Sequence, residues 1–201
     1  MQFNFDLGLR DQAAFVDSTS RFTVGDLLEK RARTDPDAIA VRESDRELTY
    51  ADLDARVNRL ANALLERGYE PEASTFAIIS ENRAEFVEVM YASAKLGCLI
   101  GAQNWRLERT ELVHCVDTVD PDVVFVSGRH ADKRAWIDES DETDPEYICF
   151  DEIVDDSAST VSYERLLESG DSSTPLPSRQ IDPEQGFVVM YTSGTTGLPK
   201  G

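Results

Sequence analysis

Short apolar runs alternate with amphipathic segments along most of this chain, and that alternation restricts the folds it can adopt. Residues 75–80, 98–102 and 123–127 are compact runs of the kind that form buried strands. Longer segments with apolar residues at helical spacing separate them. Parallel strands need long crossover connections, which helices supply. The pattern therefore predicts an α/β fold of layered, parallel-rich sheets with flanking helices.

Capping signals indicate where the helices begin and end. Thr23 and Thr49 each precede an aspartate by three residues, which is the spacing of a capping box. Asn82 is expected to cap a later helix, and Gly68 and Gly97 stand where left-handed C-caps belong. The other expected elements are a hairpin over 38–50, a helix from Glu108 or Thr110, a strand at 147–150, a helix at 162–168 and a strand at 187–191.

Composition shifts divide the chain into four parts. Residues 1–22 are a leader segment, and residues 23–170 form the α/β region. Residues 171–185 are rich in Ser, Pro and Asp and are expected to be a linker. Residues 186–201 are expected to form a last strand followed by a loop. The pattern of strands and helices is weakest between residues 128 and 159, where acidic residues are concentrated.

The charge balance excludes some classes of partner. The chain has 39 acidic and 20 basic residues, a formal net charge of −19. Nucleic acids and anionic membranes attract basic surfaces, so neither is an expected partner. Arginine (16) far exceeds lysine (4) among the basic residues. An acidic, lysine-poor surface fits a high-salt habitat as well as an ordinary acidic protein, because net charge governs solubility rather than fold.

Cysteine and histidine usage gives no sign of a metal site. Cys98, Cys115 and Cys149 lie far apart, and His114 and His130 lack ligand spacing. The cysteines are expected to be buried and His114 to be structural. No basic, apolar leader opens the sequence, and no apolar run approaches the ~18 residues of a membrane span. We therefore expect a cytoplasmic protein without an integral membrane segment.

The end of the chain carries the clearest chemical signal. Hydroxyl residues, two glycines and a lysine follow the last apolar run, and such a loop can surround a phosphate with backbone N–H groups while a lysine adds positive charge. The spacing is not that of a Walker A loop, since Pro199 stands where that motif needs its second glycine. A polar tail is the alternative interpretation of the composition. The candidate phosphate-binding residues are Thr192, Ser193, Gly194, Thr195, Thr196, Gly197 and Lys200.

The order of residues favours the phosphate loop. Residues 191–201 read Tyr-Thr-Ser-Gly-Thr-Thr-Gly-Leu-Pro-Lys-Gly, which resembles the signature loop of the acyl-adenylate-forming (AMP-forming) synthetases. That family includes acyl-CoA ligases, luciferases and adenylation domains of peptide synthetases. The resemblance extends upstream to about Thr23. It is carried there by residues 48–53, 58–64, 82–86, 95–97 and 104–107, the last being similar to free-standing acyl-CoA ligases.

Two departures concern the subfamily more than the fold. The family often has Pro-Gly-Asp where this chain has Pro71-Glu72-Ala73, and Pro-Leu where it has Ala102-Gln103. The neighbouring side chains of the 104–107 segment are given structural roles. Trp105 is expected to pack, and Arg106 to tie its loop to the sheet.

The resemblance implies an AMP-forming ligase. Such an enzyme activates a carboxylic acid, here expected to be a fatty acid, with ATP and Mg²⁺, and passes the acyl group to coenzyme A. Lys200 would be the catalytic residue, and no metal ligand is assigned. Family members continue past this loop into a C-terminal domain, so the resemblance implies an incomplete N-terminal part that is inactive alone. The alternatives are an adenylation domain that loads a carrier protein and a non-catalytic remnant; the oligomeric state is left open.

Overall fold

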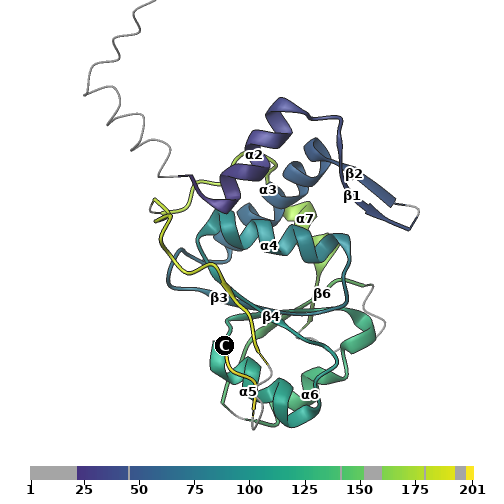
Figure 1. The fold of residues 1–201 in the computed structure, drawn as a ribbon, viewed down its shortest axis with the longest axis vertical. Coiled ribbons are helices and arrows are strands. Elements are labelled where there is room, and N and C mark those ends of the chain that lie inside the picture. The colour runs from purple at the N-terminus through teal and green to yellow at the C-terminus, as the bar shows by residue number, and fades with distance from the viewer. Residues whose placement is uncertain (1–21, 45, 141, 152–159, 179, 193–197) are drawn as a thin grey trace, which may run out of the picture.

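The computed structural model describes residues 22–44, 46–140, 142–151, 160–178, 180–192 and 198–201, and it confirms the α/β fold. A six-stranded sheet forms the middle layer, and every neighbouring pair in it is parallel (Figure 1). In spatial order its strands are β7 (Thr160–Ser162), β6 (Glu146–Cys149), β5 (Val123–Val126), β3 (Thr75–Ile79), β4 (Leu99–Gln103) and β8 (Val188–Val189).

Helices cover both faces of this sheet (Figure 1). On one face lie α2 (Val24–Thr34), α3 (Tyr50–Glu66), α4 (Ala84–Leu96) and α7 (Tyr163–Ser169). On the other lie α5 (Arg109–Val119) and α6 (Lys133–Asp138), the latter preceded by the short 3-10 helix η1 (Gly128–His130). An antiparallel hairpin of β1 (Ile39–Glu43) and β2 (Arg46–Thr49) stands beside α3 and α4.

The strands divide their side chains between two hydrophobic cores. Along β3, Phe76 and Ile78 face the α3–α4 layer, whereas Ala77 and Ile79 face α5 and α6. Alternate side chains of a strand point to opposite faces, so a strand buried on both sides must be apolar throughout. This is why the central strands are continuous apolar runs rather than alternating ones.

Most helix boundaries agree with the capping signals. Thr23 and Thr49 both form complete capping boxes, and Gly97 ends α4 with a left-handed φ of 66°. The prediction that Asn82 caps α4 is wrong. The N-cap is Arg83, whose side chain makes no capping bond, and the Glu43 carboxylate accepts the Ala84 N–H at 2.9 Å instead.

The acidic middle contains more structure than its sequence predicts. Beyond the expected strand at 147–150, it holds η1 and α6, and β7 follows it at the edge of the sheet. In contrast, the strand predicted over 187–191 is only two residues long. A strand at the edge of a sheet gains pairing on one side only, so little of its ladder is fixed.

The segment after α7 is held firmly against α3. Asn58 and Asn62 donate hydrogen bonds to the backbone carbonyls of Ser172, Asp171 and Ser173 at 3.0, 2.8 and 2.9 Å. Arg59 donates to the Gly170 carbonyl at 3.2 Å. These side chains therefore explain the polar residues of the 58–64 motif as a scaffold for the returning chain.

Candidate functional site

The predicted phosphate loop leaves the sheet beside the end of β4. Val188 pairs with Ile100 and Val189 with Gly101 in parallel register. Parallel strands end at the same edge of a sheet, so the chain after Val189 emerges where the chain after Gln103 emerges. In open α/β sheets this edge is where ligands bind.

The two ends of the loop are paired with each other. The Thr192 N–H donates to the Lys200 carbonyl at 2.9 Å, and the Lys200 N–H donates to the Thr192 carbonyl at 3.1 Å. The two hydrogen bonds form an antiparallel bridge between Thr192 and Lys200. The Lys200 side chain is exposed next to the bridge. The structure therefore brings two of the predicted residues together, whereas Ser193, Gly194, Thr195, Thr196 and Gly197 lie outside the described residues.

The pairing of Thr192 with Lys200 suits the phosphate loop that the sequence predicts. It brings two of the candidate residues together in space at the carboxyl edge of the sheet. The lysine of this pair adds a mobile cation with three donors. Neither feature requires a metal ion to attract phosphate.

A second polar cluster at the same edge could not be found from the sequence. The His130 ring is stacked on Trp105 with centroids 4.8 Å apart, and His130 Nε2 lies 3.3 Å from Glu81 Oε2. Ser127 Oγ donates to the same carboxylate oxygen at 2.9 Å. These residues follow three different strands, so no spacing in the chain relates them. His130 is 7% exposed, and the packing role predicted for Trp105 is confirmed.

The electrostatics of this cluster favour a charged carboxylate. Burial alone would raise the pKa of Glu81, but hydrogen bonds from its own backbone N–H and Ser127, with the nearby His130 and Arg129, lower it below the ordinary value. Within the described part of the chain, the Arg106 side chain makes no hydrogen bond to the sheet, so the structure does not support the predicted tie. The Arg106 guanidinium lies 4.0 Å from the centroid of the Trp105 ring and is exposed to solvent.

The three cysteines have the buried positions that the sequence predicts. Cys98, Cys115 and Cys149 are free and buried, as predicted. Burial raises the pKa of Cys98 to about 12 and that of Cys115 to about 11, so both thiols are unreactive at neutral pH. Among the described residues, no three His, Cys, Asp or Glu side chains lie where they could hold a metal ion together.

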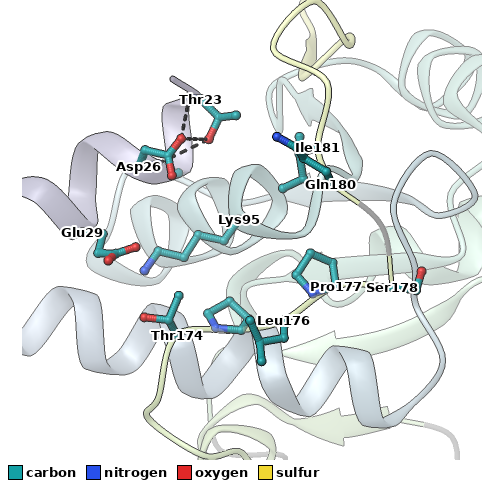
Figure 2. Close-up of a pocket in the computed structure, with 12 residues that line it drawn as sticks. Thr23, Asp26, Glu29, Lys95, Thr174, Leu176, Pro177, Ser178, Gln180 and Ile181 are labelled. Carbon is teal, nitrogen blue, oxygen red and sulfur yellow. Dashed lines mark hydrogen bonds between the residues drawn. The ribbon is translucent and has the colours of Figure 1, made fainter. Parts of the chain in front are cut away.

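A cavity of about 400 Å³ lies away from the loop, between α2, α4 and residues 174–178 (Figure 2). Its central lysine, Lys95, donates from Nζ to Asp54 Oδ1 and Asn58 Oδ1, both at 2.6 Å. The Asp26 carboxylate is bound to the N-terminus of its own helix. Lys95 therefore joins α4 to α3 and Asp26 caps α2, and none of the predicted site residues lines the cavity. No helix in the described part of the chain is long and apolar enough to cross a bilayer.

Comparison with protein families gives one match that spans most of the chain. Residues 28–201 match the family described as AMP-binding enzyme. Two curated relatives are an indoleacetate–CoA ligase of Aromatoleum aromaticum, 34% identical over 176 residues, and a 3-oxocholest-4-en-26-oate–CoA ligase of Rhodococcus rhodochrous, 32% identical over 181 residues. The alignments cover 87% and 89% of this chain but only 33% and 32% of those proteins. The chain thus spans about a third of the length of these relatives.

Solved structures show the same fold. The N-terminal domain of FACL13 from Mycobacterium tuberculosis superimposes with a TM-score of 0.73 at 28% identity, over 89% of this chain and 43% of that one. The anthranilate CoA ligase AuaEII, solved with anthranoyl-AMP, gives a TM-score of 0.78 at 21% identity, over 89% of this chain and 33% of that one. The second likeness bears on the fold alone.

Proposed function

The chain belongs to the AMP-binding enzyme family, and from this we propose that it is the phosphate-binding part of an AMP-forming acid–CoA ligase. The names of the relatives support that reaction class, since both are CoA ligases. In the proposed reaction, a carboxylate oxygen of the acid attacks the α-phosphorus of ATP. The bond between the α-phosphorus and the oxygen that bridges it to the β-phosphate breaks. Pyrophosphate leaves and an acyl-adenylate remains. The thiol of coenzyme A then attacks the acyl carbon and releases AMP.

The pairing of Thr192 with Lys200 after β8 is the observation that carries this proposal. Their bridge lies at the carboxyl edge of the sheet, where the predicted loop would bind the β- and γ-phosphates through N–H groups and hydroxyls. Lys200 would offset the negative charge that develops on the leaving pyrophosphate. The residues proposed to bind these phosphates are Thr192, Ser193, Gly194, Thr195, Thr196, Gly197 and Lys200, with Lys200 as the catalytic group.

Mg²⁺ is proposed only as a companion of ATP. The described residues provide no carboxylate cluster that fits a metal ion, so no step of the reaction is assigned to a metal held by this chain. The chain's own contribution is to bind and orient the phosphates. Such positioning, together with fixed charge, accounts for most of what a protein supplies to phosphoryl chemistry.

The acyl substrate is proposed to be a fatty acid and the setting cytoplasmic. We further propose that residues 1–201 form the four parts described above, and that alone they do not turn ATP over. Their linker, residues 171–185, includes the stretch that α3 holds in place.

The alternative acceptor is a carrier protein in place of coenzyme A. It is tested by offering the thiols of both acceptors to the complete enzyme. Faster transfer to the carrier would replace the proposed acceptor.

Substitution of Lys200 tests the role of the loop. In the complete enzyme, Lys200→Ala should lose about 1–3 kcal/mol of transition-state stabilisation, a fall in kcat/KM of about 5- to 150-fold. ATP–pyrophosphate exchange measures the adenylation step directly. Lys30→Ala is the matched control, because Lys30 is an exposed lysine on α2. Exchange kinetics that do not change in Lys200→Ala would remove this residue from the mechanism.

A further inference from the structure

We infer that Tyr191 is the positioning residue of the phosphate loop, because it fixes both ends of that loop against α5. Only the identity of the ligand that the loop binds rests on the proposed function. The placement of the loop rests on contacts of Tyr191 with residues that the function does not use.

The hydroxyl group joins the loop to α5. Tyr191 Oη donates a hydrogen bond to the Cys115 carbonyl at 2.6 Å, and Cys115 is fully buried. Burial raises the pKa of Tyr191 above its ordinary value, although the nearby Gln103 amide acts in the opposite direction. The hydroxyl therefore remains a donor at neutral pH. Gln103 is buried beside it, yet neither of its amide atoms makes a hydrogen bond of good geometry.

The ring supports the chain after the loop. A Cβ atom added to Gly201 would lie 2.9 Å from Tyr191 Cε1 and 2.7 Å from Val189 Cγ1. Contacts below 3.0 Å are not tolerated, so Gly201 rests directly on the ring because it has no side chain. Thr192 follows Tyr191 and is paired with Lys200, which precedes Gly201. A displacement of the ring would therefore move Thr192 and Lys200 together.

The strand itself is too short to hold the loop. β8 has two residues, and among the described strands it pairs with β4 alone; both of its residues are half-buried. The neighbouring Met190 is 72% exposed, and Leu198 on the returning side is 43% exposed. With few ladder bonds and little apolar burial, local opening of such a segment costs little free energy. The bond from Tyr191 to α5 supplies the anchor that this edge strand lacks.

Tyr191→Phe tests this anchor, with Tyr147→Phe as the matched control. Tyr147 is more deeply buried than the half-buried Tyr191, and its hydroxyl likewise makes one hydrogen bond, to Asp138 Oδ1 at 2.7 Å, but it lies on β6 at the other side of the sheet. The readout is amide hydrogen exchange of Thr192 and Lys200 in the 201-residue chain, followed by NMR. Loss of one hydrogen bond should speed exchange at both amides about five- to tenfold in Tyr191→Phe and leave it unchanged in Tyr147→Phe.

ATP–pyrophosphate exchange by the complete enzyme distinguishes this inference from the proposed function. A rise of about three- to tenfold in the KM for ATP is expected in Tyr191→Phe alone, because a loosened loop pays an ordering cost on binding. Faster amide exchange in the 201-residue chain, together with a complete enzyme that forms no acyl-adenylate, would support the positioning role and contradict the function. Unchanged amide exchange in Tyr191→Phe, or an equal increase in Tyr147→Phe, would overturn the inference. Gly201→Ala displaces the Tyr191 ring by steric contact and should likewise speed hydrogen exchange at the Thr192 and Lys200 amides. This second variant keeps the inference testable if a Tyr191 variant fails to fold.

Discussion

Gly170→Ala should destabilise the fold strongly, because Gly170 touches the backbone of α3. A Cβ atom there would lie 1.9 Å from the Arg59 carbonyl oxygen and 2.8 Å from its carbon. Since ordinary contacts begin near 3.4 Å, the segment would have to retreat by about 1.5 Å. The glycine's own φ of −88° and ψ of 148° suit any residue, so the effect is steric rather than conformational.

The retreat also breaks the hydrogen bonds that hold this segment. Asn62 bonds the carbonyls of Asp171 and Ser173 at 2.8 and 2.9 Å, and a shift of that size lengthens both beyond hydrogen-bond distance. Overpacking costs about 1–3 kcal/mol and each lost bond about 1 kcal/mol, so we expect a total near 3–5 kcal/mol.

Urea unfolding followed by circular dichroism measures this loss. The control is Gly186→Ala, where the nearest atom to an added Cβ lies 3.8 Å away, at Leu99 Cδ1. That variant should be neutral or slightly stabilising, because alanine restricts the unfolded chain. A loss below about 1 kcal/mol in Gly170→Ala, or one equal to the control, would refute the steric argument.

Two further predictions concern charged groups. Glu88 is fully buried and accepts from Arg56 Nε at 2.7 Å, so Glu88→Gln should cost about 3 kcal/mol or more in urea unfolding, and in high salt as well, since buried pairs are weakly screened. Glu164→Gln, which removes a 54% exposed partner of the same arginine, should cost less than about 1 kcal/mol; equal losses would contradict the role of burial. Thr49→Ala should cost about 1 kcal/mol at neutral pH by removing the cap of α3. Thr49 also donates to the Asp52 carboxylate and lowers its folded-state pKa, so this part of the stabilisation is present above the unfolded pKa of ~3.9 and is lost as pH falls through the folded-state pKa. The bond that Thr49 Oγ accepts from the Asp52 N–H remains at low pH, so a difference between variant and parent that does not shrink at all below both pKa values would contradict the pH-dependent part.

Local signals were sufficient to predict most elements of the fold. The capping boxes at Thr23 and Thr49 join atoms three residues apart, so the sequence contains everything that forms them. Apolar runs such as β3 are buried on both faces and are therefore visible as composition alone. The loop residues Thr192 and Lys200 were likewise predicted from a motif within one short segment.

Features that depend on distant partners could not be predicted. Asn82 was expected to cap α4, but the bond comes from Glu43, which reaches the helix from the hairpin 41 residues earlier. The cluster of Glu81, Trp105 and His130 joins loops that follow three different strands. Such contacts are set by the order of strands in the sheet, which periodicity does not specify.

Two of the upstream segments that carry the family resemblance hold the fold together. Asn58 and Asn62 hold the segment after α7, and Lys95 ties α4 to α3 through Asp54 and Asn58. These polar residues bond to backbone carbonyls and to one another, so they support the shared fold. The proposed phosphate binding is assigned to residues 192–200 instead, so substitutions in these two segments should change the free energy of unfolding before they change the loop.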